Sequence, residues 1–196
     1  ITRRGLKIVD ATCPKVARVQ AIIKKYVARG YTIIIVGDKG HPEIIGLLGY
    51  AAGRGIVVGS REDAVNLPVA DKVGIVAQTT QREDLYDEII KIIKEKMPQA
   101  IVFDTICDST EKRQKELKDL ASQMDAMVIV GGADSANTRR LAEISEGQGT
   151  PTFYIETGQR FREFAKEDSY TAKLVKEIID HGSLAPEFLP IWMWTD

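Results

Sequence analysis

The chain has 196 residues, of which 44% are hydrophobic and 28% are charged, a composition typical of globular proteins. Its 27 lysine and arginine residues nearly balance its 28 aspartate and glutamate residues, and the net charge of −1 gives no reason to expect nucleic acid or an acidic membrane surface as a partner. We see no apolar run long enough to span a membrane, no secretory signal pattern, and too few cysteines (2) for a disulfide framework, so the expected compartment is the reducing cytoplasm.

Short apolar runs alternate with amphipathic helical patterns along most of the chain. The predicted strands are residues 6–9, 32–36, 56–58, 73–76, 101–103, 127–130 and 152–155. Three apolar stripes at helical spacing each predict one amphipathic helix. The first stripe is Val16, Val19, Ile22, Ile23 and Tyr26, and the second is Leu85, Ile89, Ile92 and Ile93. The third, which is weaker, is Gln114, Leu117, Leu120 and Met124. Residues 161–180 predict a further helix. Strands that are apolar on both faces and alternate with helices indicate an α/β fold with parallel sheets.

Two segments of the chain repeat each other at a fixed offset. An Asp-Ala-Thr-Cys motif ends at Cys13 and an Asp-Thr-Ile-Cys motif ends at Cys107, and 107 − 13 = 94. A Val-Gly pair begins 23 residues after each cysteine, while His41 and Ser135 each lie 28 residues after theirs. A shared offset of this kind indicates an internal repeat. We therefore predict tandem small α/β units at residues 1–103 and 104–196, the second with a divergent C-terminal tail.

The repeated features fall at the edge of the predicted sheets where ligands usually bind. In parallel sheets the working loops follow the carboxyl ends of the strands, and Cys13, Cys107, His41 and Ser135 all lie there. A thiol at a helix N-terminus gains acidity from the helix dipole, although a single cysteine in such a position is more often a small buried apolar residue. Two equivalent cysteines in equivalent units suggest thiolates that converge on one centre.

Other polar motifs follow the same strands. His41 and Glu43 stand two residues apart in a predicted short loop shaped by glycine and proline, which favours an active-site role. Thr79, in a Gln-Thr-Thr motif, either caps a helix expected from Gln81 or offers its hydroxyl to a ligand. Residues 131–137 combine glycines, a serine and an asparagine before a helix expected at Thr138, a pattern that suits a phosphate site or a plain helix cap.

Together these motifs resemble the LytB/IspH family, the 4-hydroxy-3-methylbut-2-enyl diphosphate reductases of the non-mevalonate isoprenoid pathway. The resemblance covers about residues 4–156. It implies a pseudo-threefold architecture of three related α/β units around a central [4Fe–4S] cluster, with one cysteine from each unit. This chain is similar to the second and third units. The N-terminal unit has no match in it, and we expect that unit upstream. Residues 182–186 are only weakly similar to the family's C-terminal motif.

The resemblance also implies a role for each motif residue. Cys13 and Cys107 are expected to be cluster ligands, and the third cysteine ligand is expected from the missing N-terminal unit. Glu43 is the expected proton-relaying acid, which Thr79 orients. The expected contacts to the substrate and its diphosphate are His41, Thr79, Ser135, Ala136 and Asn137. Ala136 stands where the family often has serine, so we expect one hydroxyl donor to be lost.

The reaction implied is the last step of the pathway. An iron–sulfur oxidoreductase removes the hydroxyl of the allylic diphosphate substrate and releases isopentenyl and dimethylallyl diphosphates, with ferredoxin or flavodoxin as the electron donor. This chain alone is expected to be inactive, because it supplies two cysteine ligands and the cluster needs three. Two alternatives stay open. The chain could be a non-catalytic fragment or pseudoenzyme that binds phosphorylated ligands, or a thiol-redox module in which Cys13 and Cys107 form a disulfide pair.

Overall fold

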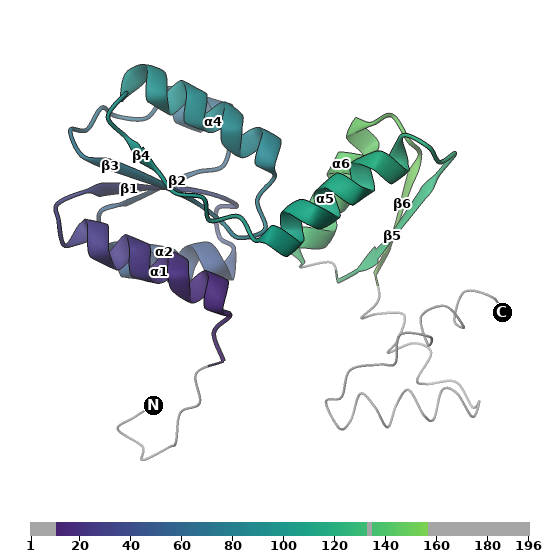
Figure 1. The fold of residues 1–196 in the computed structure, drawn as a ribbon, viewed down its shortest axis with the longest axis horizontal. Helices are drawn as coiled ribbons and strands as arrows, with labels where there is room; N and C mark the ends of the chain where they lie inside the picture. The colour runs from purple at the N-terminus through teal and green to yellow at the C-terminus, as the bar shows by residue number, and fades with distance from the viewer. Residues whose placement is uncertain (1–10, 133–134, 157–196) are drawn as a thin grey trace, which may run out of the picture. The chain divides into compact units, whose positions relative to one another are not determined.

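The structure is a computed structural model that describes residues 11–132 and 135–156 (Figure 1). The predicted strand at 6–9, the predicted helix at 161–180 and the motif at 182–186 lie outside the described residues. The chain divides into two compact units, Ile1–Leu120 and Ala121–Asp196. Within the described ranges, no helix is both long enough and apolar enough to cross a membrane.

The first unit is a four-stranded parallel sheet flanked by helices, in the strand order β2-β1-β3-β4. All four of its described strands lie where the apolar runs predict them. Its elements are α1 (Pro14–Val27), β1 (Thr32–Val36), α2 (Pro42–Ala51), β2 (Gly55–Val58), α3 (Arg61–Val65), β3 (Val73–Ala77), α4 (Glu83–Lys96) and β4 (Ile101–Val102), followed by α5 (Asp108–Ala121).

Helices cover both faces of this sheet, as the apolar strands predict. Alternate residues of a strand point to opposite faces, so Ile33 and Ile35 of β1 pack in the cluster that holds the buried residues of α1 and α2. Ile34 and Val36 of the same strand pack in the cluster that holds the buried residues of α3 and α4. Figure 1 shows α1 and α2 on one side of the sheet and α4 on the other. Each face therefore has its own apolar core, which fixes the sheet and the loops that leave it.

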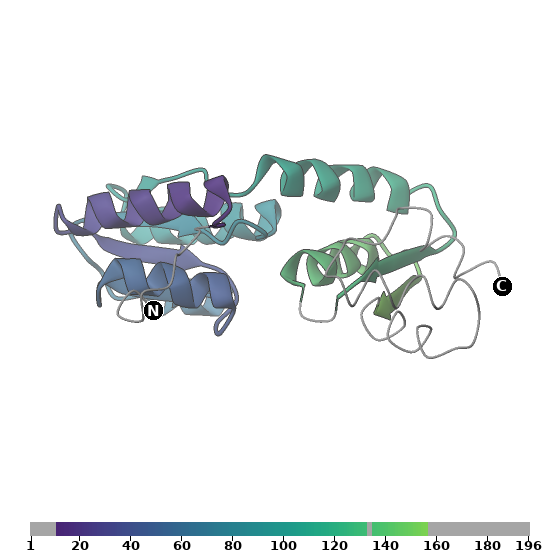
Figure 2. The ribbon, with the colours of Figure 1, turned by 90° about the horizontal axis from the view of Figure 1, so that it is seen from below.

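The second unit contains a two-stranded parallel sheet and a helix within its described part. Strand β5 (Met127–Gly131) pairs in parallel with β6 (Thr152–Glu156), and α6 (Ala136–Gly147) connects them (Figure 2). The Thr150 hydroxyl donates to the carbonyl of Ala121, which connects the segment just before β6 to the end of α5. Both strands confirm the sequence-based expectation.

The structure confirms the internal repeat. Helices α1 and α5 are offset by 94 residues at both ends (108 − 14 and 121 − 27), and α2 and α6 begin 94 residues apart (136 − 42). The two glycines of the Val-Gly pairs share one packing role. A Cβ on Gly37 would lie 2.5 Å from a side-chain atom of Ile44, and one on Gly131 would lie 2.3 Å from a side-chain atom of Thr138. Each partner stands seven residues after its glycine.

Three local predictions are wrong in detail. Pro42 and Glu43 are not in a loop but form the first turn of α2, because proline suits the first helical position and His41 caps the helix. The Gln-Thr-Thr motif does not cap a helix at Gln81, since α4 begins at Glu83 after Arg82. The third stripe is half correct. Gln114 and Leu117 are buried as predicted, but Leu120 and Met124 are exposed, and the other buried positions of α5 are Thr110 and Ala121.

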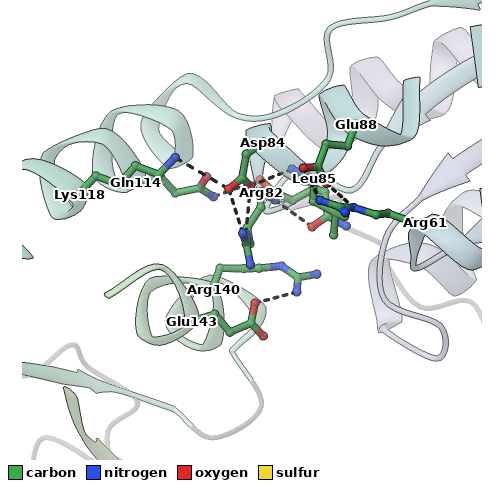
Figure 3. Close-up of polar contacts among 10 residues, drawn as sticks. Arg61, Arg82, Asp84, Leu85, Glu88, Gln114, Lys118, Arg140 and Glu143 are labelled. Carbon is green, nitrogen blue, oxygen red and sulfur yellow. Dashed lines mark hydrogen bonds and ion pairs between the residues drawn. The ribbon is translucent and has the colours of Figure 1, made fainter. Parts of the chain in front are cut away.

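The division into compact units differs from the predicted joint between residues 103 and 104. The division falls after Leu120 and so assigns most of α5 to the first unit. The buried side chain of Gln114 explains part of this difference, because it donates from Nε2 to the carbonyl of Gln81 at 3.1 Å (Figure 3). Compactness and the limits of a duplicated segment are different properties, so the joint at 103/104 stays a prediction.

Candidate active site

The strand order of the first unit places two loops side by side at the carboxyl edge of the sheet. In the order β2-β1-β3-β4, the connection after β1 leads to one side and the connection after β3 leads to the other, so the switch point lies between these two strands. The loops are in direct contact there. The N–H of Gln78 donates to the carbonyl of Val36 at 2.8 Å, and the Gln78 side chain accepts from the N–H of Asp38 at 2.9 Å. Open α/β sheets bind ligands at this kind of position.

Glu43 and Thr79 meet at this edge through two hydrogen bonds. The backbone N–H of Thr79 donates to Glu43 Oε1 at 2.8 Å, and the Thr79 hydroxyl donates to Oε2 at 2.9 Å. Thr79 is only 7% exposed, so its position is fixed by packing. Glu43 is held at both oxygens in one orientation, and each oxygen keeps a lone pair for another partner.

His41 is the N-cap of α2 and is oriented by its own helix. Its Nδ1 atom accepts from the backbone N–H of Glu43 at 3.2 Å. A neutral imidazole that accepts at Nδ1 carries its proton on Nε2, which makes Nε2–H a donor. The sequence of α2 thus places a proton donor and a carboxylate next to each other at the same helix end.

Cys107 is linked by its backbone to Thr79, the partner of Glu43. Its backbone N–H donates to the carbonyl of Thr79 at 2.9 Å, and its sulfur lies 3.0 Å from the Ser109 hydroxyl. The hydrogen bond from Ser109 lowers the pKa of the Cys107 thiol, and the backbone N–H groups at the start of α5 and the charge of Lys15 act in the same direction. Thr79 therefore joins the carboxylate of Glu43 to the loop that carries an acidified thiol.

Cys13 precedes α1 in the same way that Cys107 precedes α5. It is exposed and makes no side-chain cap to its helix. Two residues further on, Lys15 Nζ contacts both carboxylate oxygens of Asp108, at 2.7 and 2.8 Å. Asp108 is the first residue of α5, so the ion pair joins the first turns of the two helices that follow the cysteines. Both cysteines are free thiols in the structure.

The predicted phosphate residues lie in the second unit. Ser135 is the N-cap of α6, and its Oγ accepts from the N–H of Thr138 at 3.3 Å. Ala136 is buried, so its methyl group offers nothing to a ligand, although its backbone lies in the first turn of the helix. The Oδ1 atom of Asn137 is buried without a hydrogen-bond partner. An unsatisfied buried amide needs an explanation, and a bound ligand is one.

Sequence reasoning missed several residues that shape this site. Thr105 is buried, and its Oγ1 both accepts from the N–H of Ala77 and donates to the carbonyl of Ala77, which anchors the loop before Cys107. Ser109 and the Lys15–Asp108 pair were also overlooked. The only available signal was their position within two residues of a cysteine. In the part of the chain that the structure describes, no group of three or more histidine, cysteine or acidic side chains is placed to hold a metal ion.

Replacing Ser109 with alanine should raise the pKa of Cys107, because the largest cause of its lowered pKa is then removed. The test is the rate of iodoacetamide alkylation of Cys107, measured against pH in proteins that also carry Cys13→Ser. We expect this rate to reach half its maximum at a higher pH in Ser109→Ala than in the protein that keeps Ser109. Ser60→Ala is the matched control, since Ser60 caps α3 and its loss should leave the midpoint unchanged. An identical midpoint in Ser109→Ala would show that this hydroxyl does not act on the thiol.

Comparisons with known proteins agree with one another. The family model described as "LytB protein" matches residues 1–177. A 4-hydroxy-3-methylbut-2-enyl diphosphate reductase of Geobacter sulfurreducens is 47% identical over 157 residues, which are 80% of this chain and 56% of the relative. The chain spans about half the length of the curated relatives it matches.

Two solved structures are also similar. The E-1-hydroxy-2-methyl-but-2-enyl-4-diphosphate reductase of Plasmodium falciparum matches with a TM-score of 0.73 and 28% identity, over 84% of this chain and 51% of that chain. A second structure, a (E)-4-hydroxy-3-methyl-but-2-enyl diphosphate reductase described as the terminal enzyme of the non-mevalonate pathway, matches with a TM-score of 0.53 and 40% identity, over 87% of this chain and 59% of that chain. With its repeat, its α/β fold of parallel strands and its match to the family model, the chain belongs to the LytB protein family.

Proposed function

We propose that this chain forms part of a 4-hydroxy-3-methylbut-2-enyl diphosphate reductase. The reaction breaks the allylic carbon–oxygen bond, forms one carbon–hydrogen bond, and consumes two electrons and two protons, with water and an isopentenyl or dimethylallyl diphosphate as products. The observation that carries the proposal is the chain of hydrogen bonds from Glu43 through Thr79 to Cys107. It links a carboxyl group to the loop that carries a candidate metal ligand, and a reaction that couples proton transfer to electron transfer needs both groups in one site.

The two thiols fit the ligands of an iron–sulfur cluster. Clusters of this type are bound by cysteine thiolates, and Cys107 has a lowered pKa while both cysteines are free and each stands at the start of a helix. The Lys15–Asp108 ion pair joins the two helix starts, so both thiols belong to one end of the first unit. We propose Cys13 and Cys107 as two of the ligands. When bound, such a cluster supplies electrons to the allylic carbon–oxygen bond.

The proton for the departing hydroxyl is assigned to Glu43. Its two hydrogen bonds to Thr79 fix the carboxyl plane and leave a lone pair on each oxygen. Because the Thr79 hydroxyl can rotate, it can accept from a protonated Glu43 as well as donate to the carboxylate. It therefore orients the acid and can contact the substrate at the same time.

Neutral donors hold the diphosphate in this proposal. His41 offers Nε2–H, since its Nδ1 is occupied by the N–H of Glu43. Ser135 uses its oxygen to cap α6 and keeps its hydroxyl proton for an anion. Asn137 can turn its unsatisfied amide so that Nδ2 becomes a donor, and Ala136 contributes through its backbone. Helix N-termini favour anions through their free N–H groups and the helix dipole.

A chimera tests this function directly. In it, this chain replaces the matching part of the Geobacter sulfurreducens relative, to which it is 47% identical. After anaerobic incubation with iron and sulfide, we expect it to convert 4-hydroxy-3-methylbut-2-enyl diphosphate with a chemical reductant, and a ferredoxin or flavodoxin to replace that reductant. A folded, cluster-loaded chimera that binds the substrate and releases no product would support the pseudoenzyme instead. A disulfide between Cys13 and Cys107 that forms in a chimera without reductase activity would support the thiol-redox alternative.

Replacing Asn137 with alanine should weaken the binding of inorganic diphosphate to this chain by about 1 kcal/mol, the typical contribution of one hydrogen bond. Isothermal titration calorimetry measures the difference, and the affinity should fall as salt is added. Asn66→Ala is the control, because Asn66 lies at the C-terminal end of α3 and should not alter binding. Equal heats from the wild type and Asn137→Ala would mean that residues 135–137 only cap the helix and do not bind diphosphate.

A further inference from the structure

Lys15, which forms an ion pair with Asp108, has an unusual position in α1. Lys15 stands in the first turn of that helix, which contains no acidic residue. A cation at a helix N-terminus opposes the helix dipole, so this lysine is placed against the local electrostatic preference. The N-cap position holds Cys13, which makes no capping hydrogen bond. Pro14 suits the first position of the helix, but neither a side-chain cap nor an acidic residue stabilises the start of α1.

Asp108 supplies the partner that explains the lysine. It begins α5, where an acidic residue agrees with the dipole, and both of its oxygens contact Lys15 Nζ. The two residues are 93 positions apart in sequence, so the pair connects the first turns of two helices that are distant along the chain. Its side chains are 37% and 81% exposed, and exposed pairs contribute little to the free energy of folding. A geometric role accounts for the pair better than a stabilising one.

We propose that Lys15 and Asp108 are positioning residues that hold the start of α1 against the start of α5 and so keep the thiols of Cys13 and Cys107 at the spacing a shared ligand requires. Lys15 lies two residues after Cys13, and Asp108 lies one residue after Cys107. A small displacement of either helix end moves its sulfur by a similar amount. The inference rests on the proposed function in one respect, because it takes the two thiols to bind the same group.

Cross-linking of the two thiols tests the proposal without any metal. The full 196-residue chain is treated with bifunctional thiol reagents of graded length. The shortest reagent that joins Cys13 to Cys107 in the wild type should react several-fold more slowly with Lys15→Asp and with Asp108→Lys. The double variant Lys15→Asp/Asp108→Lys restores an ion pair of reversed polarity and should recover most of the wild-type rate. Monofunctional reagents give the reactivity of each thiol alone, and every cross-linking rate is divided by it.

Two further variants keep the result interpretable. Asp108→Asn removes one charge without creating repulsion and should give an intermediate rate. Arg61 and Glu88 form a two-bonded pair between α3 and α4 (Figure 3), so the exchange Arg61→Glu/Glu88→Arg and its single variants should leave the cross-linking rate unchanged. Circular dichroism in urea identifies any variant that does not fold.

Three results would overturn the proposal. They are single reversals that cross-link at the wild-type rate, a double variant no faster than the slower single one, or a folded wild type that no reagent in the series can join. These outcomes are independent of catalysis. If the chimera were inactive while the charge exchange restored cross-linking, the proposed function would fail and the positioning role of Lys15 and Asp108 would stand.

Discussion

Exchanging Glu43 for glutamine in the chimera should lower kcat by about 10²–10⁴-fold, the usual contribution of a positioned acid, while KM for the substrate changes little. Glutamine keeps the shape of the side chain and can still accept from the N–H of Thr79 through its amide oxygen. It carries no transferable proton, so the hydroxyl would have to leave without protonation. Steady-state kinetics with a chemical reductant in excess measure both constants.

Glu62 provides a matched control for this experiment. It occupies the second position of α3, as Glu43 does in α2, and both residues are acidic residues of a first helical turn. Glu62→Gln removes the same charge from the same kind of position and should leave kcat unchanged. If Glu43→Gln turned over as fast as Glu62→Gln, Glu43 would have no role as an acid.

Introducing a side chain at Gly37 should destabilise the first unit by about 1–3 kcal/mol, as overpacking usually does. In Gly37→Ala the new Cβ would lie 2.5 Å from Ile44 and between 2.8 and 2.9 Å from two side-chain atoms of Gln78. One of these, the Cβ of Gln78, is fixed to the end of β3 and cannot rotate away. Displacing Gln78 would also break its hydrogen bond from the N–H of Asp38. Urea unfolding of the full chain measures the change.

Gly46→Ala is the control for Gly37→Ala. Gly46 lies inside α2, and a Cβ there would meet nothing within 4 Å. Alanine is favoured over glycine in a helix by up to about 1 kcal/mol, so this variant should be at least as stable as the wild type. Equal destabilisation by both substitutions would mean that the close approach at Gly37 is not what fixes the loop after β1.

The sequence predicted the strands and the repeat well because both leave strong local signals. Every described strand coincides with an apolar run, and the offset of 94 recurs in helices that begin at residues 14 and 108. The start of α2 was missed because glycines at 46 and 49 interrupt its apolar pattern, while Gly40 before the helix and Pro42 at its first position suggest a loop. Tertiary packing outweighs those local preferences, since Ile44, Leu47 and Ala51 are fully or almost fully buried.

The contacts within the site could not be predicted from the chain alone. His41 and Glu43 were identified as a pair by their spacing, but the partner of Glu43 is Thr79, 36 residues further on. Likewise, nothing in the sequence connects Lys15 to Asp108. Such contacts depend on the strand order β2-β1-β3-β4, which brings the loop after β1 next to the loop after β3. Motif and spacing indicate which residues take part, and topology decides which of them meet.

The two thiols and the acid are proposed to serve one reduction, and the cysteines test this most directly. The measurement is the iron and sulfide content of the chimera together with its yield of isopentenyl and dimethylallyl diphosphates, for the wild type, Cys13→Ser and Cys107→Ser. We expect the wild type to hold a cluster and form both products, and each serine variant to lose cluster and turnover together. A serine variant that still forms product at the wild-type rate, or an active chimera free of iron, would contradict the account.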